Sequence, residues 1–449
     1  MEENDFIVEC EEERGARSGL SDKWKLVNVI LMGFAFMLLY TAFLTTSMIG
    51  KYVTDSLKIE IREDFENNDD FSKFNHSHWQ QFKTGVVQLL GYKTTMFIAS
   101  LTYLLYILVY LNPTPLFLYT ASVLNGAGGA FLWTAQGAFL HHLSGTEQLM
   151  SRNTGIFTAF FLGSMINGNL YIMIAWQGEK YVSSEMRRKI ITIFAILASF
   201  GCFLLLFLHG RCCALESAKK NKNPPKQAFS EFFQSIKRTF KLIFTEKMAL
   251  LAPYLIYYGF YFSFLSGVYP TIVGNSKNLE DSSAQVGFTG MLTGIGGLIS
   301  CAVFIFGGKF CDKINRLTIA FSFLAIHLVA FLLASVNFPN DANFTSTDAL
   351  PDWNLFGSTN LYIALIISFL IGFGDGGLKV VLYSSISEAF PADTTSVFAL
   401  KQFIETLSIA TCFFISSSIN LIALLSILIA LNILSIISFF LFRKRLNTE

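Results

Sequence analysis

Charged residues are scarce in this chain: Asp, Glu, Lys and Arg make up 14% of its 449 residues, whereas 53% are hydrophobic. Soluble domains carry about 25% charged residues. This composition therefore excludes an ordinary soluble protein and predicts a chain that crosses the lipid bilayer many times. The 47 phenylalanines suit helix surfaces that face lipid.

Signatures of catalysis and of metal binding are missing as well. The seven cysteines show neither a disulfide framework nor the spacing of a metal site. There is no phosphate loop and no nucleophile motif. We therefore expect no enzyme activity, no cofactor, no metal and no nucleic-acid partner.

The N-terminus lacks the basic start of a cleavable signal peptide. Residues 1–14 are acidic instead, and Arg17, Lys23 and Lys25 then precede the first apolar run. By the positive-inside rule, this predicts a cytosolic tail over residues 1–25.

Eleven apolar runs are long enough to cross a membrane as helices, which needs about 20 residues. They are Leu26–Gly50, Thr94–Leu111, Leu116–Leu140, Thr154–Trp176, Ile190–His209, Met248–Val273, Gln285–Gly307, Leu317–Val336, Leu361–Ile386, Val397–Ile419 and Leu421–Phe442. Between the first two, residues 51–91 are mostly polar and charged, and their short apolar part cannot cross.

A basic loop at residues 211–247 divides the runs into five and six, giving an N-terminal half (26–210) and a C-terminal half (248–442). Within the loop, Ala228–Phe244 has the spacing of an amphipathic helix, which would lie on the inner membrane surface or pack under the bundle. The loop and the tail at 443–449 are expected to be cytosolic, like the N-terminus. An odd number of spans before the loop conflicts with that, unless residues 54–91 enter the membrane or a helix is missing.

A weak internal repeat relates the two halves. Gly126–Trp133 can be laid over Gly372–Lys379, which places both segments on the fourth helix of a half. Six helices, a long basic loop and six more is the plan of the major facilitator superfamily, whose halves are parallel repeats. That superfamily's loop signature is similar to residues 308–316, through Gly308, Asp312, Lys313 and Arg316; an ordinary basic turn is the alternative.

Longer motifs resemble the UNC-93-like family of this superfamily, in its major-facilitator-domain-containing branch. They are Phe131-Leu-Trp-Thr-Ala-Gln-Gly137, Arg152-Asn-Thr-Gly-Ile-Phe157, Gly168-Asn-Leu-Tyr171, Ala175-Trp-Gln-Gly178, Phe264-Leu-Ser-Gly-Val-Tyr269 and Gly372-Phe-Gly-Asp375. The resemblance covers residues 26–442 apart from 51–90. It implies an all-α bundle of two six-helix repeats, from which this chain departs because its second helix is missing or truncated. A skipped exon, a wrong gene assembly or a real loss would each explain that departure.

Four charged residues lie well inside predicted spans: Asp375, Lys379, Lys401 and Glu405. Charge inside a membrane is costly and normally faces a bundle interior or a wet cavity. Each helix carries an acid and a base at i,i+4, on one face. The four charges either satisfy one another and fix helix packing, or form a gate or an ion-coupled site. We expect loss of Asp375 to be the most damaging, since Lys379 would lose its partner.

Other candidates are less distinctive. Trp133, Gln136, Gly128 and Gly374 are candidates to line the central cavity of this architecture, although packing against neighbours is as good an explanation for Trp133 and Gln136. His327, alone in its span, is expected to be a hydrogen-bonded core residue. Sequons at Asn75 and Asn343 predict glycosylation on the outer face.

Two functions follow from these observations. The first is a solute carrier for an unknown small solute, which works by rocking of the halves. The second, implied by the resemblance alone, is a regulatory or chaperone partner of an ion channel or membrane receptor that transports nothing. Both place the chain in a lipid bilayer, of the plasma membrane or an internal membrane, with cytosolic N- and C-termini.

Overall fold

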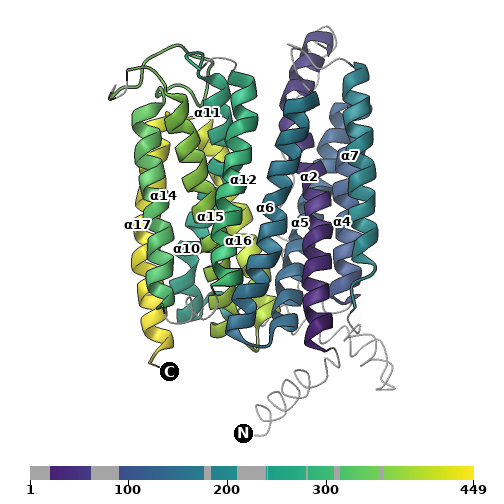
Figure 1. The fold of residues 1–449 in the computed structure, drawn as a ribbon, viewed down its shortest axis with the longest axis vertical. Coiled ribbons are helices and arrows are strands. Elements are labelled where there is room, and N and C mark those ends of the chain that lie inside the picture. The colour runs from purple at the N-terminus through teal and green to yellow at the C-terminus, as the bar shows by residue number, and fades with distance from the viewer. Residues whose placement is uncertain are drawn as a thin grey trace, which may run out of the picture.

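The computed structural model describes residues 21–61, 90–175, 184–209, 239, 241–279, 282–307, 314–353, 355 and 357–448. These ranges are almost entirely helical (Figure 1). The helices are α2 (Asp22–Ile61), α4 (Tyr92–Val109), α5 (Pro115–Ser144), α6 (Glu147–Ala175), α7 (Ser184–Leu205), α10 (Glu246–Ser263), the π-helical turn η2 (Phe264–Val268), α11 (Tyr269–Asn275), α12 (Ser282–Phe306), α14 (Arg316–Asn337), α15 (Leu361–Ala389), α16 (Thr394–Ser416) and α17 (Leu421–Leu446).

Local sequence sets the ends of these helices. The side chain of Asn360 accepts bonds from the first backbone amides of α15, and Asn420 and Thr245 do the same for α17 and α10. Helix α5 has Pro115 in its first turn and ends at Gly145, whose φ of 68° lies in the left-handed region. These residues set where α10, α15 and α17 begin and where α5 begins and ends.

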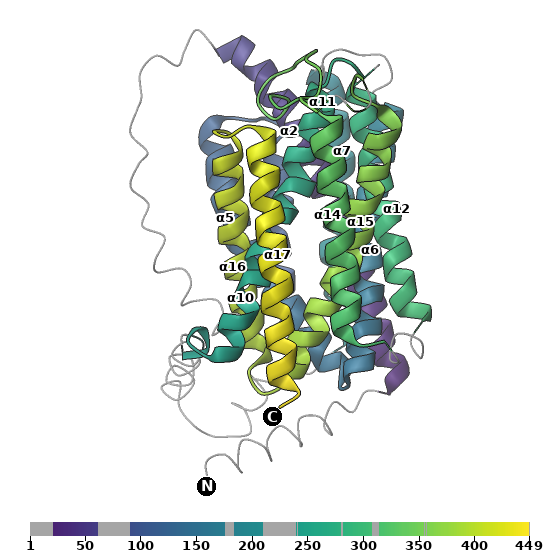
Figure 2. The same cartoon turned by 90° about the vertical axis from the view of Figure 1, so that its left-hand side faces the viewer.

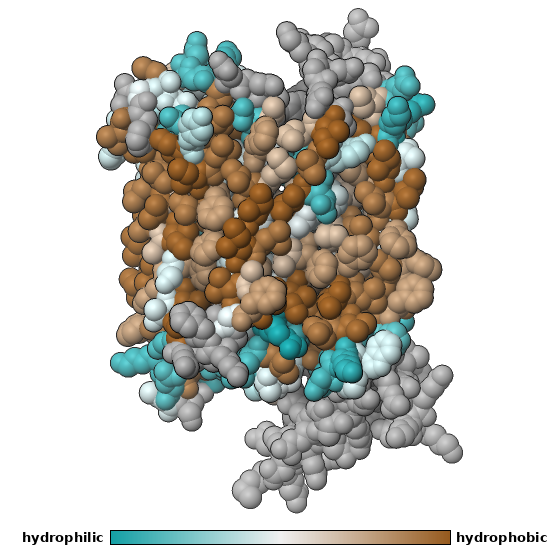
Figure 3. Space-filling view, in the orientation of Figure 1, coloured by the Kyte–Doolittle hydropathy of each residue, from teal (hydrophilic) through white to brown (hydrophobic). Residues whose placement is uncertain are grey.

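Ten of the helical segments are long and apolar enough to span a membrane. The remaining long helix, α6, has 29 residues and packs along α2 and α12. Figure 3 shows a continuous apolar band with polar side chains gathered above and below it. All eleven predicted runs are helical, so that part of the sequence prediction is confirmed.

The helices form two groups that stand side by side (Figure 1). The first group contains α2, α4, α5, α6 and α7, and the second contains α10 to α17. Helix α6 joins them by packing on α12 and α15, and α5 contacts α16. Figure 2 shows α14 and α17 on the outer side of the second group. The division of the chain within residues 211–247 stays a prediction, because most of that loop lies outside the described residues.

The helices of the two groups pack in the same pattern, except that one helix position of the first group is empty among the described residues. Helix α5 packs on α4 as α15 packs on α14, and α2 packs on α6 and α7 as α10 packs on α16 and α17. In the second group α12 also packs closely on α15: a Cβ at Gly372 would meet the backbone oxygen of Thr293 at 1.8 Å. The counterpart glycine, Gly126, has nothing within 4 Å. Among the described residues, no helix stands beside α5 where α12 stands beside α15.

The direction of α2 and α4 resolves the conflict over the odd number of spans. Lys25, at the start of α2, and Tyr92, at the start of α4, both lie close to His142. Both helices therefore begin at the same end of the bundle and run in parallel. Because of this, α7 ends beside the start of α2, where the backbone of His209 and the side chain of Asn28 exchange two hydrogen bonds. We call this end, which also carries the C-terminus, the terminal face (Figure 1).

Three buried tyrosines fasten α10 and α11 to α15. Tyr254, Tyr261 and Tyr269 donate hydrogen bonds of 3.1, 2.8 and 2.6 Å to backbone oxygens of α15. Those oxygens belong to Leu378, Ile371 and Ala364, which are spaced seven residues apart. A carbonyl oxygen has two lone pairs and can accept such a bond beside its helical one.

The π-helical turn η2 keeps the third tyrosine in register. Tyr254 and Tyr261 are seven residues apart, but Tyr261 and Tyr269 are separated by eight. A π turn widens the helix to i→i+5 bonding and absorbs one extra residue. Tyr269 therefore faces α15 as the other two do, and the three bonds join α10 and α11 to α15 from Ala364 to Leu378.

We expect Tyr261→Phe to lower the free energy of unfolding by about 1 kcal/mol, because it removes one buried hydrogen bond. Unfolding in mixed detergent with increasing dodecyl sulfate measures this. Tyr119→Phe is the matched control, since Tyr119 is 73% exposed and should lose nothing. Equal stability of both variants would contradict a fastening role for these bonds.

Candidate functional site

The four intramembrane charges of the sequence lie together in the interior of the bundle. Asp375 and Lys379 come from α15, and Lys401 and Glu405 from α16. Their residues are 0, 4, 3 and 5% exposed, respectively. Each is close enough to others of the set for electrostatic interaction. We call these four residues the charge cluster.

The α16 pair forms the predicted i,i+4 ion pair. The Lys401 Nζ atom lies 2.7 Å from Glu405 Oε2, and the same ammonium lies 5.1 Å from the centre of the Tyr383 ring. The second carboxylate oxygen, Glu405 Oε1, is buried without a hydrogen-bond partner. Direct contact compensates much of the cost of burying these two charges.

The α15 pair does not form, contrary to our expectation. Asp375 accepts a hydrogen bond of 2.8 Å from the Tyr258 hydroxyl of α10 through Oδ1, and its Oδ2 is buried without a partner. In the described part of the chain, no ion pair joins Asp375 to Lys379. The i,i+4 spacing permits such a pair, but the Asp375 carboxylate is bonded to Tyr258 and the Lys379 ammonium lies over aromatic rings.

Lys379 points across to the first group of helices. Its Nζ atom lies 4.3 Å from the centre of the Phe161 ring of α6 and 5.3 Å from that of Trp133 of α5. A cation over an aromatic face is attracted by the ring quadrupole, by about 2 kcal/mol or more when water is excluded. Lys379 therefore links the two groups through aromatic rings.

The rings belong to a larger cluster that we call the aromatic box. It consists of Phe36, Tyr40, Trp133, Phe157 and Phe161, whose neighbouring ring centres lie 5.0 to 6.1 Å apart. The Tyr40 hydroxyl donates to that of Tyr103, at 2.8 Å. Every member comes from the first group, so the box and the charge cluster face each other between the groups.

The predicted cavity-lining residues divide into two kinds. Trp133 belongs to the box, and Gln136 is buried and accepts a 3.1 Å bond from the Tyr383 hydroxyl of α15. The two glycines do not line a cavity. A Cβ at Gly128 would overlap the Thr102 side chain of α4, and one at Gly374 would overlap the His327 ring of α14. Their role is close helix packing, which small residues permit.

Arg316 is the member of the loop signature that the structure describes, since Gly308, Asp312 and Lys313 lie outside the described residues. It pairs with Glu147 of α6, and it donates a 3.1 Å bond to Ser151 and a shorter one to Ser384. The first two partners belong to the first group. Arg316 thus bridges the groups at the terminal face.

His141 of α5 makes a second bridge at the same level. Its Nδ1 atom contacts the Ser387 hydroxyl of α15, and its Nε2 lies 3.3 Å from the Thr394 hydroxyl of α16. The hydrogen bonds and ion pairs that cross between the groups, among described residues, all lie between Tyr383 and the terminal face. On α15, Lys379 is one turn further from that face.

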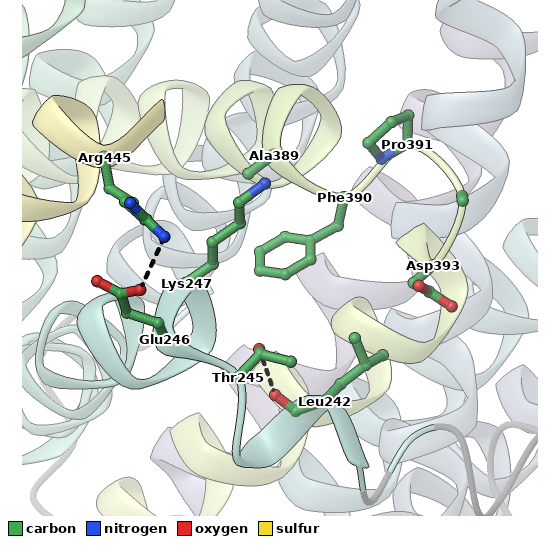
Figure 4. A pocket seen from close by; sticks show the side chains of 10 residues that line it. Leu242, Thr245, Glu246, Lys247, Ala389, Phe390, Pro391, Asp393 and Arg445 are labelled. Atoms are coloured by element: carbon green, nitrogen blue, oxygen red, sulfur yellow. Dashed lines mark hydrogen bonds and ion pairs between the residues drawn. The ribbon is translucent and has the colours of Figure 1, made fainter. Parts of the chain in front are cut away.

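A pocket of ≈ 420 Å³ opens on the terminal face between α10, the α15–α16 turn and α17 (Figure 4). Its polar wall includes Lys247, Asp393 and the ion pair of Glu246 with Arg445 at 3.2 Å. No member of the charge cluster lines it. The pocket is therefore separate from the site between the groups.

Two further predictions concern Asn343 and His327. The Nδ2 atom of Asn343, the atom that glycosylation would modify, donates to the backbone oxygens of Ser416 and Ile419 at 3.0 and 2.8 Å. A glycan would replace one of the two Nδ2 hydrogens, so Asn343 could not keep both bonds. The other sequon, Asn75, lies outside the described residues. His327 is a hydrogen-bonded core residue as predicted, since its Nδ1 lies 2.7 Å from the Tyr257 hydroxyl.

Sequence reasoning missed the aromatic partners of the charges. Tyr258 lies in a conspicuous run of tyrosines, Tyr254 to Tyr261, and that run was the available signal. Nothing in the sequence joins Phe161 to Lys379, because aromatic residues are abundant in every predicted span.

Comparisons with known proteins match the chain over most of its length. The family model of the ion channel regulatory protein UNC-93 matches residues 71–440. The UNC93-like protein MFSD11 of Xenopus tropicalis is 30% identical over 434 residues, covering 93% of this chain and 95% of that protein. The UNC93-like protein 3 of Arabidopsis thaliana is 21% identical, covering 77% of this chain and 72% of that protein.

A solved structure shares the arrangement of helices. The major facilitator superfamily transporter FucP, in its outward conformation, superposes with a TM-score of 0.56, covering 92% of this chain and 98% of that chain. The sequence identity of 14% makes this a likeness of fold alone.

The geometry changes which charge we expect to matter most for stability. Glu405→Gln leaves the buried Lys401 without its ion-pair partner and should cost about 3–5 kcal/mol. Asp375→Asn breaks no ion pair and keeps an oxygen for Tyr258, so it should cost less than about 2 kcal/mol. Unfolding of both purified variants in dodecyl sulfate measures the difference. A larger loss for Asp375→Asn would restore the idea that Asp375 and Lys379 act as a pair.

Proposed function

The chain belongs to the UNC-93 family, with a major-facilitator-type fold in the membrane, and from this premise we propose that it carries a small solute by alternating access. The site between the groups is where such a carrier would hold its cargo. The observation that carries the proposal is the one-sided closure: the hydrogen bonds and ion pairs that join described residues across the groups lie on the terminal side of Lys379.

The bridges at the terminal face have the character of a gate. Arg316 with Glu147, His141 with Ser387 and Gln136 with Tyr383 each join a residue of the first group to one of the second. These contacts would have to break for the terminal side to open. Beyond Lys379, the described contacts between the groups include packing of Ile166 and Leu162 of α6 against glycines of α12.

We place the terminal face in the cytosol. Arg443, Lys444 and Arg445 end α17 there, and the basic loop of the sequence joins α7 to α10 at the same face. Cytosolic segments of membrane proteins are enriched in Lys and Arg. The gate would then close the inner side.

A regulatory partner of a channel or receptor is the second candidate. The face of α5 that has no neighbouring helix among the described residues favours it. Five large apolar residues there, Leu116, Phe117, Tyr119, Val123 and Leu124, are 43 to 73% exposed, and Gly126 has no neighbour. A glycine on an exposed helix face allows close approach of another helix. The family model's description as a channel regulator agrees with this reading.

Flux measurements separate the two candidates. The full chain in liposomes should take up at least one solute from a panel of labelled carboxylates, amino acids, sugars, amines and nucleosides, saturably and above protein-free liposomes. No flux from the whole panel, together with stable co-purification of a channel subunit, would overturn the carrier proposal.

We expect Glu147→Gln to loosen the gate. An exposed or half-exposed ion pair is worth about 1 kcal/mol, so its loss should shift the equilibrium toward the inward-open form by about 5-fold. A cysteine replacing Gln136, in a background free of other cysteines, should react correspondingly faster with an impermeant maleimide added from the terminal side. Gln136 is fully buried in the closed form.

Glu246→Gln is the matched control. Glu246 pairs with Arg445 on the same face at 3.2 Å, and both residues belong to the second group. Its loss should leave the labelling rate unchanged. Equal acceleration by both variants would show general loosening and would contradict a gate.

A further inference from the structure

No described residue accepts a hydrogen bond from Lys379, which is 4% exposed. Its ammonium has three N–H bonds, and its described contacts are the faces of Phe161 and Trp133. Ring faces attract a cation but do not replace hydrogen-bond acceptors, and a buried charge without them is costly. An anionic group placed beside Nζ would form a charge-assisted hydrogen bond, which is stronger than a neutral one.

Both neighbouring carboxylates keep one oxygen free. Asp375 Oδ2 and Glu405 Oε1 are buried without partners, while their other oxygens bond Tyr258 and Lys401. The site therefore holds acceptor capacity as well as the donor. Because Glu405 is in direct contact with an ammonium, Asp375 is the carboxylate that can accept a proton more easily.

Charge balance restricts what can bind. Asp375, Lys379, Lys401 and Glu405 carry formal charges that sum to zero. A ligand of net charge would leave one charge uncompensated in a low-dielectric interior, which costs several kcal/mol. An anion that enters together with one proton avoids that cost.

The aromatic box, which faces the charge cluster, restricts the chemistry of the ligand's uncharged part. The first group faces Lys379 with the aromatic box, and the hydroxyls of Tyr40 and Tyr103 are bonded to each other. Such a wall favours an apolar or aromatic surface, and the box supplies no ionised group.

We propose that the cargo is a small monocarboxylate with an aromatic or other apolar body, whose carboxylate binds Lys379 while its body packs on Trp133 and Phe161. This rests on the carrier function proposed above and names its substrate class.

The proposal includes a proton that travels with the anion. Asp375 Oδ2 takes one proton from water on the open side and becomes an uncharged carboxyl group. The anion then pairs with Lys379, and the loaded site stays neutral. On the other side the carboxylate leaves and Asp375 returns the proton to water, so one anion and one proton move together.

The titratable groups that interact with Asp375 come from four helices. They are Tyr254, Tyr258 and Tyr261 of α10, Cys301 of α12, Lys379 of α15, and Lys401 and Glu405 of α16. His327 of α14 packs on the neighbouring Gly374. Tyr258 already donates to Oδ1, and His327 is engaged by Tyr257, so neither competes for the proton on Oδ2.

Three probes with one aromatic body test the charge preference. Titration calorimetry on the purified full chain would compare 3-phenylpropanoate, 3-phenylpropanamide and 3-phenylpropylamine. The carboxylate should bind at least about 10-fold more tightly than the amide, as expected for one charge-assisted bond. Equal or tighter binding of the amide or the amine would overturn the proposal.

Charge-neutral variants keep the test independent of folding. Asp375→Asn/Lys379→Gln removes one charge of each sign and should abolish the preference for the carboxylate; retention of the preference would overturn the role of Lys379.

Asp375→Asn alone imitates the protonated carboxyl and should bind the anion with an affinity that does not change with pH. The parent affinity should fall by up to about 10-fold per unit of rising pH.

Proton uptake and flux separate this proposal from the carrier function. Calorimetry in phosphate and in Tris should show one proton taken up per anion bound by the parent and none by Asp375→Asn; no uptake by the parent would overturn the coupling. Carboxylate binding that depends on Lys379, without flux of any solute, would sink the carrier function and leave the anion site standing. Flux of another solute without carboxylate binding would sink the site alone.

Discussion

The cost of placing charge in the membrane interior governs this structure. Lys401 and Glu405 meet that cost by direct contact at 2.7 Å. Lys379 does not have a carboxylate in contact and lies instead over rings from the other group of helices. A buried charge without an ion-pair partner in its own group favours contact with the other group. We therefore interpret the charge cluster as part of the interface between the groups, and not only as a packing contact within the second group.

Buried tyrosines join the helices α10, α11 and α15 of the second group. Three side chains of α10 and α11 bond backbone oxygens of α15, and the π turn η2 corrects their spacing. Asp375 lies on the same helix and is bonded to Tyr258 of α10. Under the carrier proposal, a rearrangement that separates the groups would carry Asp375 and Lys379 with α15 and change what faces them across the interface.

Much of the fold could be predicted from the sequence, because membrane spans depend on a local property, the length of an apolar run. The burial of the charge cluster followed from the same reasoning. The parallel course of α2 and α4 could not be predicted, since it depends on the polar segment between them. The partners of Lys379 were also beyond reach: Phe161 is one of 47 phenylalanines, and pairing across the chain leaves no local signal. The glycines were recognised as significant but assigned to the cavity, whereas Gly128 and Gly374 serve helix contacts.

The gap beside α5 makes the interface between the groups asymmetric. On one side, α6 packs on α12 from Gly155 near the terminal face to Asn169, with glycines of α12 allowing close approach. On the other side, the contact of α5 with α16 includes Phe398 against Gly137, near the terminal face, while the far part of α5 is exposed. A long, tightly packed seam resists separation more than a short contact does, because it loses more close-packed area. Under the carrier proposal, rocking of the groups would therefore pivot about the α6–α12 seam, with α5 and α16 separating first.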